Sequence, residues 1–149
     1  MPARTLSFAL LLTACIVWSA CDEKLSSLAG PTATLTPAFT SIQQDIFESG
    51  DNSGRTACTQ CHISGNPLSG GLNLTHDAAY TQLVNARSRF RTGAILVIPG
   101  DSENSYLIQK LKGAPGIFGL RMPRNGPPYL TDGQMLIIER WIALGAPQN

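Results

Sequence analysis

The sequence predicts an all-α fold, and three observations indicate it. Apolar residues recur at three- and four-residue spacing in four separate stretches, which is the period of an amphipathic helix. No stretch of strand length shows a recurring alternation of apolar and polar residues. Glycine and proline, 14 and 10 of the 149 residues, mark turns between these stretches. We therefore expect one small domain of about four helices.

The first 20 residues are predicted to be a secretory signal peptide. A short basic segment with Arg4 precedes an apolar run over residues 6–17, and the small residues Ser19 and Ala20 follow. This is the order of a signal peptide and its cleavage site. The alternative is a membrane anchor, but the apolar run is shorter than the ~20 residues of a spanning helix. We expect export, to the periplasm.

Cys21 is the candidate site of lipid attachment. It follows small residues at the end of the apolar run, as in a bacterial lipoprotein, and cleavage before it exposes a polar start. Residues 12–15 fit the lipoprotein consensus better, but cleavage before Cys15 would leave an apolar N-terminus. The other alternative is ordinary cleavage near Ala20, which gives a soluble protein. A single acyl chain binds membranes only marginally, so stable anchoring needs more than one.

The mature chain divides into a tether and a domain. Residues 21–37 are rich in Ser, Thr, Ala and Pro and are expected to form a flexible tether with an r.m.s. span of roughly 20–25 Å. Residues 38–149 are expected to form the folded domain. Loss of Arg4 with the signal lowers the basic residues from 11 to 10, equal to the 10 acidic residues. This balance argues against a nucleic-acid partner, which requires a basic excess.

The four helices are expected in this order along the chain: about 37–48, 77–87, 102–112 and 131–145. The last is the best defined, because Thr131 and Gln134 have the spacing of a capping box and Gly145 stands at its end. Thr75 is the candidate N-cap of the second helix, and residue 101 or 102 that of the third.

One segment of the chain has the residues of a cofactor or metal site: Cys58-Thr59-Gln60-Cys61-His62. Cys15 and Cys21 belong to the signal and its processing site, so Cys58 and Cys61 are the cysteines left for the domain. Thioredoxin-like chemistry needs a βαβ context, which is not visible. A zinc site needs four ligands, and His62 and His76 are the only histidines. C-x-x-C-H is the signature of covalent haem attachment, in which both thiols bond to one haem and His62 ligates its iron.

The second axial ligand of the iron is sought among His76, Met122 and Met135, since electron carriers use Met or His. Met135 lies on the apolar face of the last helix and is expected in the core. His76 falls in the first turn of a helix and is expected to be exposed. Met122 lies in a loop rich in glycine and proline, where Pro123 restricts its backbone to extended conformations. Met122 is therefore the predicted ligand.

Ligation by His and Met favours ferrous iron and raises the reduction potential. A filled coordination shell also leaves no position for a substrate. The expected function is therefore that of a non-enzymatic carrier of single electrons between exported or membrane redox proteins, alone or as a subunit of an oxidoreductase complex. The alternative is a haem-based enzyme or gas-sensing subunit with an open distal site. A third possibility is a module without haem, in which C-x-x-C forms a disulfide or metal site.

The order of several motifs along the chain resembles that of a known protein family. After C-x-x-C-H the chain carries GGLNL at 70–74, PGDSxxSxL at 99–107, RMP at 121–123, Leu130 and WIxxGA at 141–146. This order resembles the planctomycete-type cytochrome c domain, a branch of class I cytochrome c, over about 39–147. The resemblance implies one haem c, Met122 as its distal ligand, and crossing first and last helices, with Ile46 or Phe47 against Trp141. The stretch 48–57 is longer than is usual in this family.

Five arginines gather in the second half of the chain: Arg87, Arg89, Arg91, Arg121 and Arg124. One or two of them are candidates to pair with haem propionates, because guanidinium groups suit bidentate carboxylate contacts. The alternative is a solvated basic face.

Overall fold

The structure is a computed structural model that describes residues 36–149. The predicted signal peptide, Cys21 and nearly all of the tether over 21–37 lie outside the described residues. The described part is helical, and its only β-type pairings are isolated bridges, so it has no sheet. The prediction of a helical fold is confirmed at this level.

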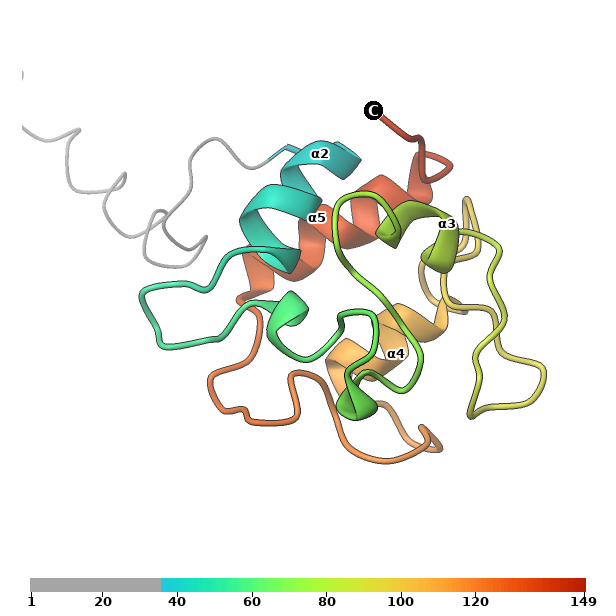
Figure 1. The fold of residues 1–149 in the computed structure, drawn as a ribbon. Coiled ribbons are helices and arrows are strands. Elements are labelled where there is room, and N and C mark those ends of the chain that lie inside the picture. Colours follow the sequence, from blue (N-terminus) through green and yellow to red (C-terminus); the bar gives the residue numbers. More distant parts are fainter. Residues whose placement is uncertain (1–35) are drawn as a thin grey trace, which may run out of the picture.

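Four helices and three short turns follow one another along the chain (Figure 1). They are α2 (Phe39–Ile42), the π-helical turn η1 (Gln43–Phe47), the 3₁₀ turns η2 (Cys58–Gln60) and η3 (Pro67–Ser69), α3 (Ala79–Leu83), α4 (Tyr106–Lys112) and α5 (Asp132–Ala143). Long loops join them, as the glycine and proline content predicts.

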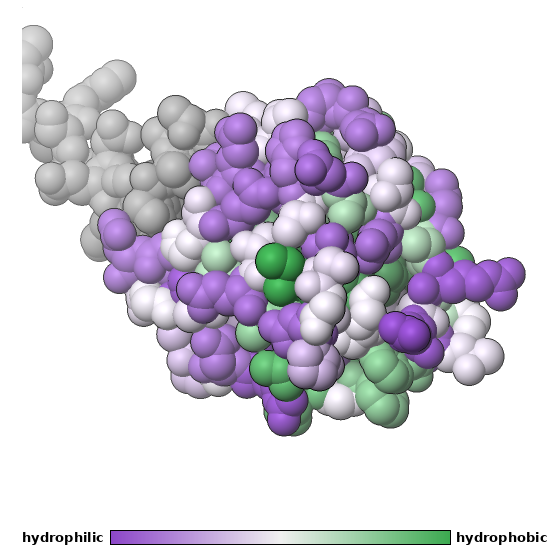
Figure 2. Space-filling model, in the orientation of Figure 1, coloured by the Kyte–Doolittle hydropathy of each residue, from purple (hydrophilic) through white to green (hydrophobic). Residues whose placement is uncertain are grey.

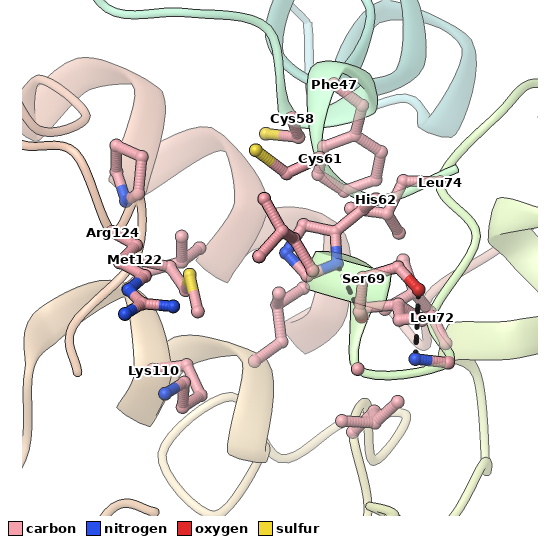
Figure 3. A pocket seen from close by; sticks show the side chains of 18 of the residues that line it. Phe47, Cys58, Cys61, His62, Ser69, Leu72, Leu74, Lys110, Met122 and Arg124 are labelled. Carbon is pink, nitrogen blue, oxygen red and sulfur yellow. Dashed lines mark hydrogen bonds between the residues drawn. The ribbon is translucent and has the colours of Figure 1, made fainter. Parts of the chain in front are cut away.

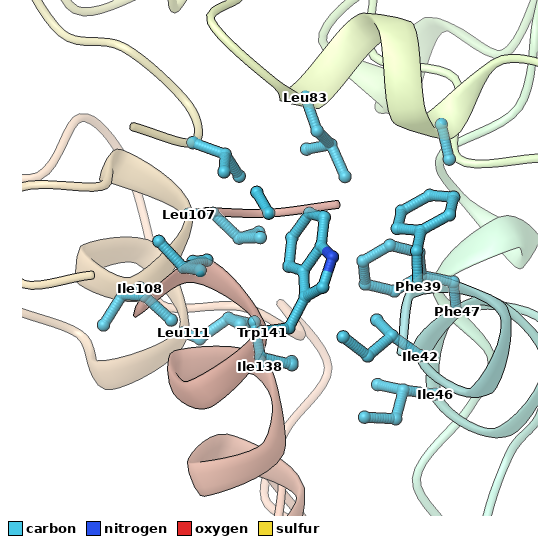
Figure 4. Packing of buried hydrophobic residues seen from close by; sticks show 14 of the residues in the cluster. Phe39, Ile42, Ile46, Phe47, Leu83, Leu107, Ile108, Leu111, Ile138 and Trp141 are labelled. Carbon is cyan, nitrogen blue, oxygen red and sulfur yellow. The ribbon is translucent and has the colours of Figure 1, made fainter. Parts of the chain in front are cut away.

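The N-terminal helix and α5 pack together, and Trp141 is the centre of their contact (Figure 4). The indole is fully buried, and its nitrogen donates to the carbonyl of Pro147 at 2.9 Å. The ring centroid of Phe39 lies 5.3 Å from that of Trp141. Ile46 and Phe47 belong to the same buried cluster. The first and last helices therefore pack together, and Phe39 is the ring that meets Trp141.

Asn149 closes the N-terminal end of α2. The amide of Phe39 donates to the Asn149 side-chain oxygen at 2.9 Å, and the amide of Thr40 donates to its backbone oxygen at 2.9 Å. The first amides of a helix have no partner within the helix, so these two bonds satisfy groups that would otherwise need water.

The last helix begins and ends as predicted. The Thr131 hydroxyl accepts from the amide of Gln134 at 3.2 Å, and the Gln134 side chain accepts from the amide of Thr131 at 3.0 Å. Ala143 is its last residue, and Gly145 follows with a φ of +94°. Met135 is 8% exposed and lies in the core, also as predicted.

The second helix is shorter than the expected range of 77–87. It starts after Ala78, so Thr75 is not its N-cap, and Val84 already has an extended backbone. Beyond this point the amide of Asn85 bonds to the carbonyl of Val97 at 2.9 Å, and isolated bridges join the two segments. Pairing with a distant segment therefore ends the helix early.

The third helix also starts late, at Tyr106 in place of residue 102. The hydroxyl of Ser105 donates to the carbonyl of Asp101 at 2.6 Å and accepts from the amide of Ile98 at 2.9 Å. Ser105 is fully buried, so these bonds fix a turn over 101–105 that competes with the helix.

Hydrophilic residues cover much of the face seen in Figure 2, and hydrophobic surface is divided among smaller patches. Within residues 36–149, every helix is too short or too polar to cross a membrane.

Candidate cofactor site

A cavity of about 1270 Å³ lies among the loops that join the helices. It is larger than the ~300–1,000 Å³ of ordinary small-molecule sites. Much of its wall is apolar and comes from segments spread over residues 47–130: Phe47, Leu72, Leu74, Leu83, Leu96, Leu107, Leu111 and Leu130. Such a cavity can hold a large, mainly apolar group.

All four predicted haem-site residues line this cavity: Cys58, Cys61, His62 and Met122. Figure 3 shows the two thiols side by side, with the imidazole of His62 close to them and the thioether of Met122 across the cavity. Cys58 and Cys61 are both free thiols. The fold thus brings together a motif and a methionine that are 60 residues apart in sequence.

The two other ligand candidates lie elsewhere. The side chain of His76 is 69% exposed, and Met135, on the buried face of α5, is in the core; neither lines the cavity. Of the three candidates, Met122 alone reaches the site of His62.

A tight turn places the motif. The amides of Cys61 and His62 both donate to the carbonyl of Cys58, at 3.2 and 2.8 Å. These two hydrogen bonds close the motif into a single turn. The two thiols and the imidazole lie on the side of this turn that faces the cavity (Figure 3).

His62 is oriented through its Nδ1 atom, which lies 3.0 Å from the carbonyl oxygen of Ser69. Because a carbonyl only accepts, Nδ1 carries the proton, and Nε2 keeps its lone pair for a metal. The turn that presents this carbonyl is fixed by Asn66, whose side chain accepts from the amide of Leu68 at 2.9 Å. Burial lowers the pKa of His62, the charge of Lys110 lowers it further, and backbone hydrogen bonds oppose both effects. The imidazole is thus held in the neutral form that ligates metals.

Arg55 supports the motif from behind, a role that was not predicted from the sequence. Its side chain is 2% exposed. Nε donates to the carboxylate of Asp51 at 2.9 Å. The other nitrogens donate to the carbonyls of Ile46 (3.2 Å), Thr56 (3.1 Å) and Ser49 (3.0 Å). One buried guanidinium therefore ties the end of η1 to the long loop and to the start of the motif.

The end of η1 also holds the motif directly. The thiol of Cys58 lies 3.6 Å from the carbonyl of Ile46, and the hydroxyl of Thr59 donates to the carbonyl of Phe47 at 3.3 Å. Burial raises the pKa of the Cys58 thiol, and the charge of Arg55 opposes that rise. The long stretch 48–57 therefore leaves the first helix in contact with the motif. The four-residue spacing of Asp51 and Arg55 was the available signal.

The loop of Met122 is anchored on α4. The amide of Met122 donates to the carbonyl of Lys110 at 2.9 Å. The ammonium of Lys110 donates to the carbonyls of Phe118, at 2.8 Å, and Leu120. Burial lowers the pKa of this ammonium. A single lysine thus fixes the segment that leads into Met122.

The charged residues of the cavity wall are all basic within the described part of the chain: Arg55, Arg87, Arg89, Lys110 and Arg124. Three of the five clustered arginines thus line the cavity, whereas Arg91 and Arg121 do not. A wall of this charge favours a ligand that carries carboxylates.

An imidazole and a thioether are donors that suit the iron of a haem, and two neighbouring thiols suit covalent attachment of its porphyrin. Over residues 36–149, no group of three or more His, Cys, Asp or Glu side chains is placed to hold a metal ion. Comparison of the chain with models of protein families, with curated proteins and with solved structures finds no match.

Proposed function

We propose that the chain is a c-type cytochrome, in which Cys58 and Cys61 hold one haem covalently and His62 ligates its iron. More specifically, we propose a mono-haem carrier of single electrons with Met122 as the second axial ligand. The observation that carries this proposal is the convergence of all four side chains on one large, apolar cavity.

Each residue has a distinct task in this proposal. Each thiol adds its S–H across one vinyl group of the porphyrin, which forms a thioether and requires no oxidant. When bound, the haem supplies an iron that alternates between the ferric and ferrous states. His62, held by the Ser69 carbonyl, offers Nε2. Met122 offers a soft donor that favours the ferrous state and raises the potential.

The finer fold is proposed as well: a class I cytochrome c-like arrangement of about four helices around the haem. Two features support it. The N-terminal helix packs across α5 through Phe39 and Trp141, and the loops between the helices supply the cavity wall.

Export, the membrane association and the redox partners remain proposals from the sequence. The chain is proposed to work in the periplasm, with redox proteins as donor and acceptor, and to be tethered through a lipid on Cys21. Labelling with a radioactive fatty acid in a bacterial host tests the tether. We expect labelled parent and an unlabelled Cys21→Ser variant, with Cys15→Ser labelled like the parent; label that depends on Cys15 would contradict the assignment.

Covalent haem is tested by intact mass. The full chain is produced with the c-type maturation machinery, and the parent is expected to gain the mass of one haem. Double replacement of Cys58 and Cys61 by serine should abolish the gain, and His76→Ala should retain it because His76 is exposed away from the cavity. Parent protein without the added mass overturns the proposal and favours a module without haem.

Carbon monoxide tests the distal ligand. The ferrous parent is expected to resist carbon monoxide at neutral pH, and Met122→Ala is expected to bind it readily and to have a lower potential. Met135→Leu, a core substitution of similar volume, should behave like the parent. Ready binding by the parent would favour an enzyme or gas sensor with an open distal site. Unchanged spectrum and potential in Met122→Ala would show that another residue ligates the iron.

A further inference from the structure

Arg121 and Tyr129 lie on either side of Met122 in sequence and stack on each other. The guanidinium carbon of Arg121 is 3.8 Å from the centroid of the Tyr129 ring. Arginine over an aromatic face is an attractive cation–π arrangement. The contact closes residues 122–128 into a loop whose two ends are joined.

Neither side chain lines the cavity. Any influence of this pair on a group bound in the cavity must therefore pass through the loop that carries Met122, and not through direct contact.

Arg121 is anchored to α4 independently of the stack. Its Nε donates to the carbonyl of Leu111 at 2.7 Å. This carbonyl is in the last turn, where carbonyls lack partners within the helix and a cation is favoured by the helix dipole. The side-chain carbons of Arg121 also lie over Gly113, where a Cβ atom would come within 3.0–3.2 Å of them. The absence of a side chain at Gly113 therefore provides the space that the side chain of Arg121 occupies.

Tyr129 is seated in a similar way. A Cβ atom added at Gly126 would lie 2.5 Å from a ring carbon of Tyr129, so the ring rests directly on the backbone there. The ring thus contacts both the tip of the loop and the guanidinium that leads into it. These contacts fix the part of the loop that follows Met122.

After Met122, an exposed side-chain hydrogen bond from Asn125 to Thr56 also holds the loop, at 3.2 Å. The other contacts fix the part of the loop that precedes Met122. Lys110 binds the carbonyls of Phe118 and Leu120, and the amide of Met122 bonds to the Lys110 carbonyl. Without the stack, the part after Met122 would keep only the exposed bond of Asn125 to another loop, which is weak. The loop could then swing, and its thioether would meet the iron less often. The other cation–π pair of the described chain, Arg91 and Tyr106, is longer at 5.3 Å and does not flank a donor atom.

We propose that the Arg121–Tyr129 stack is the positioning device that keeps the thioether of Met122 directed into the cavity. This inference rests on the proposed function, since it concerns how the second axial ligand is held. Arg121 and Tyr129 are positioning residues, and they act through the loop over 121–129.

Two substitutions at one position test it in the haem-loaded full chain. Tyr129→Leu removes the aromatic face, whereas Tyr129→Phe retains it. We expect the ferrous Tyr129→Leu protein to bind carbon monoxide at least tenfold faster than the parent and to have a lower reduction potential. Tyr129→Phe should stay within twofold of the parent. Arg121→Lys keeps the charge but loses the planar guanidinium, and its rate should lie between those of the parent and Tyr129→Leu.

Two controls separate positioning from general destabilisation and from loss of charge. Ile138→Val loosens the buried face of α5, so it should lower Tm and leave the carbon monoxide rate unchanged. Arg140→Gln removes one exposed positive charge from α5 and should change neither Tm nor the rate of carbon monoxide binding. If Tyr129→Leu lowers Tm but keeps the rate and potential of the parent, the stack is merely structural and the inference is overturned. If Tyr129→Leu does not fold, the rate and potential of Arg121→Lys decide, and parental values overturn the inference.

Amide hydrogen exchange gives a readout that does not depend on the iron. In Tyr129→Leu, exchange should quicken over residues 119–128 and stay unchanged over 58–70; unchanged exchange over 119–128 also overturns the inference. Failure of the proposed function has a different signature. It is a parent that lacks covalent haem, or one that itself binds carbon monoxide readily.

Discussion

The wall of the cavity that carries His62 and the wall that carries Met122 are built in different ways. Behind His62 stands a buried cation, Arg55, whose hydrogen bonds all stay within nine residues along the chain. Behind Met122 stand Lys110 and Arg121, which are partly exposed. Lys110 reaches from α4 to the loop, and Arg121 reaches from the loop to α4. The first wall is a locally folded unit, whereas the second is a loop whose place depends on where α4 packs.

One side-chain hydrogen bond joins the two loops directly. The amide of Asn125 donates to the hydroxyl of Thr56 at 3.2 Å, across 69 residues of sequence. Both groups are exposed, so this bond is weak, and the separation of the walls is set by the packing of the helices. The motif is therefore preorganised by its own neighbours, while the place of Met122, the proposed distal ligand, depends on the tertiary structure.

The largest expected effect follows from loss of the buried cation. Arg55→Met leaves Asp51 without its cation and removes the guanidinium donor from three carbonyls. Breaking a buried ion pair costs about 3–5 kcal/mol, and we expect about 3 kcal/mol because Ser53 still donates to Asp51. Urea unfolding measures it, with Arg140→Gln as a surface control within about 0.5 kcal/mol of the parent. A loss below about 1 kcal/mol would mean that Arg55 does not hold this wall together.

The second effect is a pH dependence of the folding stability, which arises from Asp51 in the wall that carries His62. Burial raises the pKa of Asp51, but hydrogen bonds from Ser53 and Arg55 and the charge of Arg55 outweigh this and bring it below its ordinary value of 3.8. The folded pKa is therefore the lower one, so the stabilisation is complete above the ordinary value and is lost as the pH falls through the folded pKa. The stability of the parent should drop over this acidic range more steeply than that of Asp51→Asn. Parallel curves would contradict the assignment.

A smaller effect on stability is expected where the loop that carries Met122 leads into α5. Thr131→Ala removes the capping hydroxyl and should lower the free energy of unfolding by about 1 kcal/mol, whereas Thr131→Ser should retain most of it. Hydrogen exchange should quicken in the first turn of α5 and not around His62. Equal quickening at both places would show that the two walls unfold as one unit.

The smallest effect concerns a surface ion pair. The ammonium of Lys112 lies 2.6 Å from a carboxylate oxygen of Glu139, with side chains 57% and 26% exposed. Exposed pairs contribute about 0–1 kcal/mol, and salt screens them. Lys112→Gln should therefore change stability by at most about 0.5 kcal/mol, less at high salt. A loss that is larger and independent of salt would show that the contact between α4 and α5 rests on this pair.

The terminal helices were predictable and the middle ones less so, for identifiable reasons. The capping box of Thr131 and Gln134 is a local signal, and the structure retains it. The second helix is cut short by pairing with Val97, and the third by the bonds of the Ser105 hydroxyl, neither of which is visible in a helical period. Arg55 was missed because one arginine in a polar loop looks the same whether its charge is buried or solvated.

The helical class and the motif at 58–62 follow from the sequence alone, and so does the prediction of Met122. Spacing along a chain dictates which groups share a turn and which loop is too irregular to be a helix. The tertiary structure was needed to show that Met122 lines the same cavity as His62, that Arg55 lies behind the motif, and that Arg121 and Tyr129 stack on each other. Each of these contacts is made between residues that lie in different turns or in distant segments of the chain. They are set by the packing of buried side chains around Trp141, and no local pattern encodes that packing.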